Sequence, residues 1–438
     1  MGTVFSPLDK ELGLAAGHLS SLVLEAVVRL ATWMPFGRAV REAGWFLGVT
    51  LSETSVRRLT EAAGHSYEAV QTAQVAALER EVPVAPQGPP VQALFVDGAM
   101  VPLVDGVWGE VQTLAVGTVE VLPEGERRRG RQEVRTTDLT YFSRMSDHET
   151  FTRLALVETQ RRGTETAGTV CAVNDGAVWI TACVQHHRPD AVRILDWPHA
   201  AEYVHAVAKA VFGTETPAAR AWVAQQKETL LYGDPVVFLA GLAAVSAQVS
   251  AVAEGEEERL VWTVVAEPPL QGVLGHEAAQ QAAPVVAGSL EYLRKRAAEI
   301  QYAAFRAAHY PIGSGSVESA NKVLVEARLK GAGMRWAPAS VNPMVALRTV
   351  ACNDRWAEAV PAIGAAQRQE RQDATRQRRA LRLAEQARLL AERAEQERPA
   401  ATPPTEPPAK PATPVRRRSC RPGPHHPWRT GSFGRRSA

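Results

Sequence analysis

The chain has 438 residues, of which 45% are hydrophobic and 22% are charged. At roughly 150 residues per domain, this length allows two or three domains, and the composition excludes a chain that is disordered throughout. The 49 basic residues nearly balance the 47 acidic ones, but residues 415–438 contain seven arginines and no acid. We therefore expect this segment to meet an anionic partner.

Four cysteines are scattered singly, with no CxxC pair, which favours a reducing compartment and argues against structural zinc. The N-terminus lacks the basic start and apolar core of a secretory signal. Residues 235–253 are uncharged and long enough to span a membrane, but they are rich in alanine and interrupted by Ser246, Gln248 and Ser250. We expect a buried helix there, no membrane contact and a cytoplasmic location.

The first region, residues 1–80, is expected to be helical. Apolar residues recur at helical spacing over 38–47, Gly48 turns the chain, and residues 50–53 offer a capping box to a second helix that Gly64 ends. Two short helices around a glycine turn are typical of the helix-turn-helix modules that bind DNA. The pattern leaves an alternative open, which is a plain helical hairpin with a solvated surface.

Four prolines make residues 81–90 a linker, and an α/β region begins after it. Apolar runs bounded by turn residues predict its strands, and helical spacing between two of them predicts a helix. The strands are expected at 91–96, 107–122 (one long or two short), 138–145, 169–174 and 191–195, and the helix at 147–161.

An alanine-rich stretch of helical period follows the strands, and it is too long for a connection, so we expect an inserted helical subdomain. A loop of glycine and serine then leads to a helix at 317–329 that Ser316 caps. The complete division is a helical region 1–80, a linker 81–90, the first part of an α/β core 91–213, an all-helical insertion 214–308, the second part of the core 309–357, a charged helix 358–398 and a disordered basic tail 399–438.

Three of the expected strands are followed by an aspartate, namely Asp97, Asp175 and Asp196, and the first two precede a glycine. A single Asp-Gly usually marks an ordinary turn. The repetition points further, because two divalent cations about 4 Å apart need carboxylates that converge from different elements. A sheet fixes the spacing of such groups while the strand ends stay open to substrate.

The order of these elements, three strands, a helix and a fourth strand, is that of ribonuclease H-like folds with a mixed sheet. In that arrangement the first and fourth strands bring Asp97 and Asp175 together, and Asp196 ends the fifth strand. A third acid is expected on a later helix that packs against the sheet. Glu318, in the first turn of the helix after the glycine-serine loop, is the candidate.

Four stretches of the sequence carry a resemblance to a known family. They are FVDGAMVPL (95–103), VNDGAVWI (173–180), ILDWPHAAEYV (194–204) and YPIGSGSVESANKVLVEARLKGAGMRW (310–336). Together they resemble the DDE transposases of bacterial insertion sequences, most closely the ISKra-type group, which is related to the Mutator-like transposases. The resemblance covers about residues 5–357, and the fourth stretch is highly specific.

The resemblance implies a ribonuclease H-like catalytic domain interrupted by an all-helical insertion, in a bacterial, nucleoid-associated transposase. By motif it assigns the catalytic acids to Asp97, Asp175 and Glu318, which would bind two Mg²⁺ or Mn²⁺ ions. The implied substrates are the double-stranded DNA of transposon ends and target, and the joining of two ends implies a homo-oligomer. Asp196 and His199 match a position that looks structural and joins the last strand to the insertion.

Basic residues around the third acid are expected to hold the DNA backbone, a contact that carries no sequence information. They are Lys322, Arg328, Lys330 and Arg335, and on the second N-terminal helix Arg57 and Arg58 are expected to contact DNA as well. Arg328 has an alternative role as a cap of its helix C-terminus. Glu326 shares the face of Glu318 but is better interpreted as an ion-pair partner of Lys322 or Lys330.

Other classes of function stay open on the residues alone. A non-catalytic or domesticated DNA-binding protein would rely on the N-terminal arginines and the basic tail, and another ribonuclease H-like nuclease would use the same acids. A glycosidase with paired carboxylates is disfavoured by the 6% aromatic content and by the basic residues around Glu318.

Overall fold

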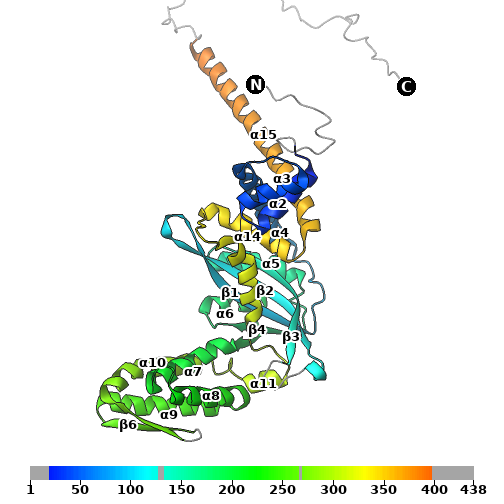
Figure 1. Ribbon diagram of the computed structural model, residues 1–438. Helices are drawn as coiled ribbons and strands as arrows, with labels where there is room; N and C mark the ends of the chain where they lie inside the picture. The colour runs from blue at the N-terminus through cyan, green and yellow to red at the C-terminus, as the bar shows by residue number, and fades with distance from the viewer. Residues whose placement is uncertain (1–18, 127–132, 266–268, 397–438) are drawn as a thin grey trace, which may run out of the picture. The chain divides into compact units, whose positions relative to one another are not determined.

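The computed structural model of the protein describes residues 19–126, 133–265 and 269–396 (Figure 1). These residues fall into two compact units, one that ends at Asp373 and one that begins at Ala374. Residues 1–18 and the basic tail expected at 399–438 lie outside the described residues, so the expectations for that tail stay predictions.

A five-stranded mixed sheet lies at the centre of the first unit, and the α/β class expected from the sequence is confirmed (Figure 1). The order across the sheet is β3-β2-β1-β4-β5. The first three strands are antiparallel neighbours, whereas β4 and β5 run parallel to β1. The strands are β1 (Val91–Pro102), β2 (Trp108–Val121), β3 (Val134–Arg144), β4 (Thr169–Asn174) and β5 (Val192–Leu195).

The first strand is longer than expected, because it does not end at Asp97 but continues to Pro102. Its first half pairs with β4 over Val91–Leu94, and its whole length from Gln92 pairs with β2. Asp97 therefore lies inside β1, opposite Thr113 of β2 and past the end of the parallel pairing. The Asp-Gly pair resembles a turn signal, but both of its residues lie in register with residues of β2.

Both faces of the central strands are covered. Successive side chains of a strand point to opposite faces, so each strand contributes to two cores. On one face, Leu94 and Val96 pack with Phe151 of α5 (His148–Arg161) and with α6 (Val178–His187). On the other face, Phe95 and Val173 belong to a core shared with the helical insertion. Each such side chain contributes roughly 1.5–3 kcal/mol by leaving water. The helix expected at 147–161 is confirmed, and Asp147 caps it by accepting a hydrogen bond from the Thr150 N–H at 2.8 Å.

The insertion after the sheet is not all-helical, which corrects the expectation for 214–308. A two-stranded antiparallel sheet, β6 (Arg259–Val264) with β7 (Leu270–Gly275), interrupts the helices. Leu260 and Val264 are buried while Val261 is exposed, an alternation of period two. Gly272 allows the hairpin to close, because a Cβ there would lie 2.1 Å from the Trp262 ring. The helices are α7 (Trp197–Phe212), α8 (Pro217–Tyr232), α9 (Pro235–Glu254), α10 (His276–Lys295) and α11 (Tyr302–Ala307).

Helix α9 is the one helix in the described part of the chain that is long and apolar enough to cross a membrane. Length and composition alone are weak evidence for that role. One side of α9 carries Phe238 and Leu242, which are buried in the core shared with α10. Two other residues of α9, Val236 and Val237, are 67% and 62% exposed. The expected buried helix is therefore buried along one face only.

The N-terminal helices α2 (Ser21–Trp33), α3 (Phe36–Leu47) and α4 (Glu53–Glu81) confirm a helical region with a turn at Gly48, whose φ is +66°. Ser52 caps α4 by accepting the Ser55 N–H at 3.1 Å, so the cap lies two residues later than expected. Gly64 does not end this helix. It lies where α4 meets α14 (Pro338–Cys352), and a Cβ there would be 2.3 Å from the carbonyl oxygen of Pro343.

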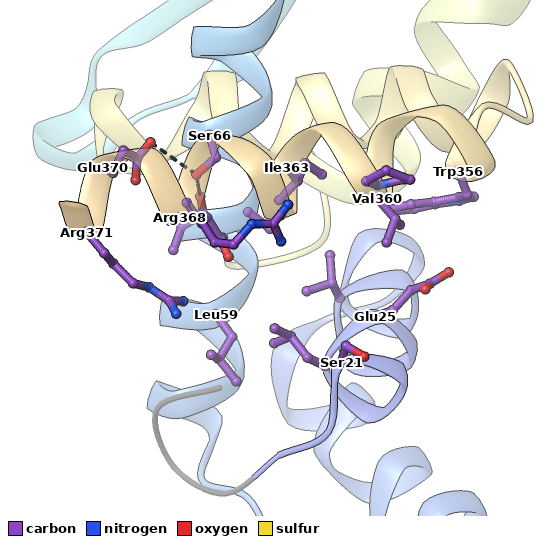
Figure 2. Close-up of a pocket in the computed structure, with 17 residues that line it drawn as sticks. Ser21, Glu25, Leu59, Ser66, Trp356, Val360, Ile363, Arg368, Glu370 and Arg371 are labelled. Atoms are coloured by element: carbon purple, nitrogen blue, oxygen red, sulfur yellow. Dashed lines mark hydrogen bonds between the residues drawn. The ribbon is translucent and has the colours of Figure 1, made fainter. Parts of the chain in front are cut away.

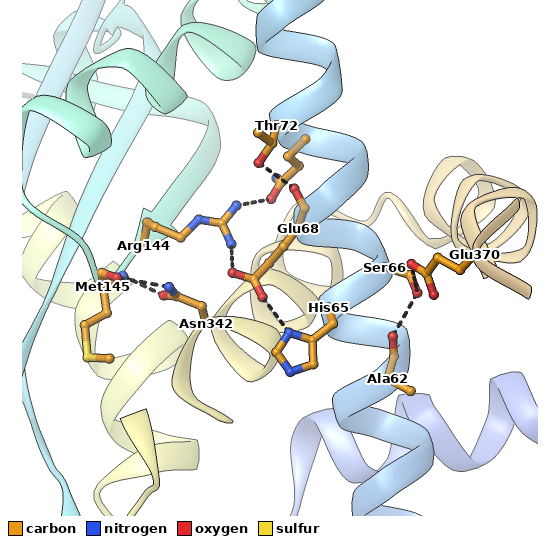
Figure 3. A network of polar contacts seen from close by, with 10 residues as sticks. Ala62, His65, Ser66, Glu68, Thr72, Arg144, Met145, Asn342 and Glu370 are labelled. Atoms are coloured by element: carbon orange, nitrogen blue, oxygen red, sulfur yellow. Dashed lines mark hydrogen bonds and ion pairs between the residues drawn. The ribbon is translucent and has the colours of Figure 1, made fainter. Parts of the chain in front are cut away.

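Polar contacts tie α4 to the sheet, as Figure 3 shows. The buried guanidinium of Arg144 on β3 donates to Glu68 at 2.9 Å and to Gln71 at 2.7 Å. Desolvation raises the pKa of Glu68 and lowers that of Arg144, while their mutual attraction opposes both shifts. Asn342 of α14 also bonds the backbone of Met145, at 2.7 and 3.0 Å. The second half of α4 thus belongs to the same packed unit as the sheet.

The helix that carries Glu318 changes its hydrogen-bonding pattern part-way. It begins as α12 (Gly315–Asn321), passes through a π-helical turn, η3 (Lys322–Glu326), and ends as α13 (Ala327–Leu329). It starts two residues earlier than expected, and Ser316 lies inside it rather than capping it. The charged helix expected at 358–398 is the greater part of α15 (Trp356–Gln396), which spans both units.

Candidate functional site

The first candidate acid, Asp97, is half-buried and held by two donors. Its Oδ1 accepts the Gly98 N–H at 2.8 Å, and its Oδ2 accepts the side-chain amide of Asn321 at 2.9 Å. Burial raises the pKa of Asp97, and these two hydrogen bonds oppose the rise. The negative charges of Asp175 and Glu318 raise it further. The charges of the second and third expected acids therefore both act on Asp97.

The second acid, Asp175, follows β4 directly, and its Oδ1 accepts the Ala177 N–H at 2.9 Å. Two side chains at the end of α10 hold the backbone of this loop, Tyr292 within the helix and Arg296 directly after it. The Tyr292 hydroxyl donates to the carbonyl of Asp175 at 2.6 Å, and Arg296 donates to the carbonyl of Gly176 at 2.6 Å. Gly176 has a φ of +79°, and a Cβ there would lie 2.5 Å from Arg296 Nε. The insertion thus supports the loop that carries Asp175.

Aromatic packing makes this support rigid. The ring of Tyr203 on α7 stacks on Tyr292 at a centroid distance of 4.0 Å, and the Arg296 guanidinium lies 3.7 Å from the Tyr292 ring centre. A cation over a tyrosine face contributes about 0.5–1 kcal/mol or more. Tyr292 therefore contacts a ring and a cation while its hydroxyl binds the loop that carries Asp175.

The third acid, Glu318, lies in the first turn of α12 and is exposed. The buried face of this helix sets its position. Ala320 and the following Leu324 pack with Ala99 and Val101 of β1. Glu318 is therefore carried by a helix that is docked on the strand that carries Asp97.

The donor set suits a hard divalent cation, because it consists of carboxylate oxygens. Each oxygen that accepts one hydrogen bond keeps a further lone pair. The spacing is a different matter: within residues 19–126, 133–265 and 269–396, no three His, Cys, Asp or Glu side chains lie close enough together to hold a metal ion. Two of the carboxylates thus act on Asp97 through their charges, but among the described residues the three do not form a closed ligand cluster.

Asp196 and His199 link the last strand to the loop before α12. Asp196 is fully buried; its Oδ1 accepts the Ser314 N–H at 2.6 Å, and its Oδ2 accepts the His199 ring N–H at 3.2 Å. Asp196 also caps α7. The hydrogen bond to Asp196 raises the pKa of His199 to about 8, against a smaller opposing effect of burial. These contacts agree with the structural role expected for the pair.

Four of the six expected DNA-binding cations are exposed, namely Arg57, Arg58, Lys322 and Arg335. Lys330 is partly buried and pairs with Glu326 at 2.7 Å, which confirms the ion-pair interpretation of Glu326. The exposed residues are available to phosphate, and their contact with DNA stays a prediction.

The expectation for Arg328 as a DNA contact is wrong, because this side chain is 1% exposed. Its Nε donates to the carbonyl of Ala31 at 3.0 Å, and its guanidinium lies over the rings of Phe36 and Trp336. Burial and the neighbouring Arg348 lower its pKa to about 10. Arg328 does cap a helix C-terminus, but that of α2 rather than its own.

Arg348 of α14, also buried, binds the same two segments. It donates to the carbonyl of Thr32 at the end of α2 at 3.2 Å, and to the carbonyls of Val323 and Leu324 in the π-helical turn. A π-helical turn leaves carbonyls without their usual intrahelical partners. The two arginines therefore join the N-terminal helices to the helix that carries Glu318.

A cavity of about 590 Å³ lies away from these acids, between α2, α4 and the start of α15 (Figure 2). Its lining is mostly apolar, from Leu59 to Val360 and Ile363, with Glu370 and Arg371 at one end. None of the expected catalytic residues lines it.

Three residues at the acids were not expected from the sequence. Asn321 follows Glu318 by three positions, so helical spacing was a usable signal that both share a face. Tyr292 and Arg296 are four apart at the end of a helix, but nothing local connects them to a loop more than a hundred residues earlier.

A comparison with models of known protein families finds none that matches the chain, and a comparison with curated proteins finds no significant relative.

Proposed function

We propose that the chain is a DDE-type transposase that cleaves DNA strands and transfers them with divalent metal ions. The observation that carries the proposal is the placement of three acids on one ordered set of elements. Asp97 lies on β1, Asp175 follows β4, its parallel neighbour, and Glu318 lies on a helix docked on β1. The charges of Asp175 and Glu318 both raise the pKa of Asp97, which supports a shared site.

The strand order supports a ribonuclease H-like assignment for the fold. Three antiparallel strands followed by two parallel ones, with β1 between β2 and β4, is the order that the sequence resemblance implies. The insertion between Asp175 and Glu318 falls where that family carries one. The end of its α10 and the residue that follows contribute the side chains that hold the Asp175 loop.

The residues present divide the work of such a site between them. Asp97, Asp175 and Glu318 would hold two Mg²⁺ or Mn²⁺ ions. When bound, such a pair of ions activates an attacking water or 3′-hydroxyl and stabilises the leaving oxygen. The Gly98 and Asn321 donors hold Asp97, and Tyr292 with Arg296 holds the Asp175 loop. Asp97 and the loop that carries Asp175 are thus held by different parts of the chain.

The exposed cations supply the contacts to substrate in this proposal. Lys322 follows Glu318 on the same helix, and Arg335 lies beyond its end. Both would bind the backbone of double-stranded DNA, and Arg57 with Arg58 on α4 would bind it elsewhere. Synapsis of two transposon ends calls for a dimer or larger assembly on DNA, in the cytoplasm of a bacterium at its nucleoid.

The test is strand cleavage and joining on a plasmid that carries the DNA flanking the gene, with Mg²⁺ and the full chain. Asp97→Asn, Asp175→Asn and Glu318→Gln should each lower the rate by about 10³-fold or more, since metal-assisted charge stabilisation is worth several kcal/mol. DNA binding, measured by gel shift, should change less than about twofold, because phosphate contacts remain. Glu326→Gln is the matched control and should cleave like the wild type.

Strand transfer that survives in any of the three variants would refute the assignment. One observation favours a second candidate, a non-catalytic DNA-binding protein: the acids do not form a closed ligand cluster among the described residues. Such a protein would tolerate loss of all three acids without change in any DNA transaction, whereas the proposed transposase would lose strand transfer.

A further inference from the structure

The side chain of Asn321 makes a hydrogen bond to the first candidate acid, Asp97. It lies at the end of α12 and is 5% exposed. Its amide nitrogen donates to Asp97 Oδ2 at 2.9 Å, across 224 positions of sequence. An amide donor to an ionised carboxylate makes a hydrogen bond stronger than a neutral one.

The other half of the same amide is left unused. Asn321 Oδ1 is buried and has no hydrogen-bond partner among the described residues. A buried polar atom without a partner costs roughly 1–3 kcal/mol, and such atoms cluster at functional sites. A leucine has nearly the same shape and would avoid this cost, but it would also remove the hydrogen bond to Asp97. The amide is therefore half satisfied, and the one hydrogen bond that its side chain makes within the described part of the chain goes to the candidate acid.

The position of Asn321 along its helix supports a role at the acids. It follows Glu318 by three residues, so both side chains lie on one face. The π-helical turn begins at the next residue, Lys322, and inserts its extra residue only after this pair. The spacing between Glu318 and Asn321 is thus kept regular, and the change of helical pattern falls outside it.

We propose that Asn321 is a positioning residue that fixes the Asp97 carboxylate in the conformation that binds the divalent cation. This inference rests on the proposed function, because it presumes that Asp97 binds a metal. It assigns to α12 two tasks at once. The helix supplies one carboxylate, Glu318, and holds another, Asp97, which comes from the strand beneath it.

The experiment is a titration of the full chain with Mn²⁺, followed by the electron paramagnetic resonance signal of the free aqueous ion, which disappears on binding. Asn321→Leu removes the donor and the unused acceptor together and keeps the shape. It should weaken Mn²⁺ binding about tenfold, the effect of losing one hydrogen bond to a charged group. Its thermal midpoint should stay close to that of the wild type, because removal of the unpartnered oxygen offsets the loss of the hydrogen bond to Asp97.

Three further variants make the result decisive. Asn321→Ala also lacks the donor and should lose the same affinity. Ser319→Ala, at an exposed position of the same helix, is the matched control and should bind Mn²⁺ like the wild type. Asp97→Asn should abolish the binding that Asn321→Leu weakens.

The two proposals fail in different ways. If Asp97→Asn binds Mn²⁺ like the wild type, the metal site and the proposed function fail together. If Asp97→Asn loses binding while Asn321→Leu and Asn321→Ala keep wild-type affinity, the role of Asn321 is overturned and the metal site stands. If both Asn321 variants unfold, Asn321 serves the fold, which also overturns the inference.

Discussion

The contact between α4 and α14 at Gly64 predicts an unusual sign for a glycine-to-alanine change in a helix. A Cβ on Gly64 would lie 2.3 Å from the carbonyl oxygen of Pro343 and 2.6 Å from its C and Cα atoms. These are backbone atoms, which cannot rotate away, so Gly64→Ala forces the two helices apart. Overpacking of this kind costs about 1–3 kcal/mol, and the better helix propensity of alanine returns up to about 1 kcal/mol.

We expect Gly64→Ala to lower the free energy of unfolding by about 2 kcal/mol, measured by urea denaturation with circular dichroism. Gly288→Ala in α10 is the matched control, because nothing lies within 4 Å of the Cβ that it adds. It should raise the free energy of unfolding by about 0.5–1 kcal/mol. If both variants stabilise the protein, Gly64 does not meet α14 and the packing of the N-terminal helices on the sheet is wrong.

Two more predictions concern the loops that carry acids. Tyr292→Phe removes the hydroxyl that binds the Asp175 carbonyl but keeps the stacked ring. The cleavage rate constant should therefore fall about fivefold, which corresponds to about 1 kcal/mol. Tyr232→Phe, at an exposed position of the same insertion, is the control and should leave the rate unchanged. The imidazole of His199 should titrate near pH 8 when its ring resonances are followed by NMR, and in Asp196→Asn the midpoint of this titration should move toward pH 6.5. Because the pKa of His199 is raised in the folded state, its contribution to stability is complete below about pH 6.5 and is lost as the pH rises through about 8. An unshifted midpoint in Asp196→Asn would contradict this.

Strands were the most predictable part of the fold where burial and turn chemistry agree. Residues 169–174 form β4 within the expected bounds, because an apolar run there ends in Asn-Asp-Gly. For β1 the two signals conflict. Asp97-Gly98 resembles a turn, but pairing with β2, a tertiary effect, carries the strand five residues past Asp97. The hairpin β6–β7 was missed because alanine-rich helices on both sides dominate its composition.

The candidate acids could be picked from their places at strand ends and in a first helical turn, but their surroundings could not. Arg328 follows the same helix and looks like a free surface cation. Its burial depends on Ala31, Phe36 and Trp336, which come from three other elements or loops. Periodicity describes one helix at a time and does not say which partner covers it. The expectations for Asp97, Asp175 and Glu318 as catalytic residues stay predictions until the variants are measured.

The buried pair Arg328 and Arg348 has a consequence for how this chain can be rearranged. Their acceptors on α2 are main-chain carbonyls, so no point substitution in that helix removes them, whereas its deletion would strand two guanidinium groups in an apolar interior. The N-terminal helices are consequently not an interchangeable cassette. A chimera that grafts another N-terminal helical region onto this sheet must also replace the two arginines or provide a helix end for them to bind.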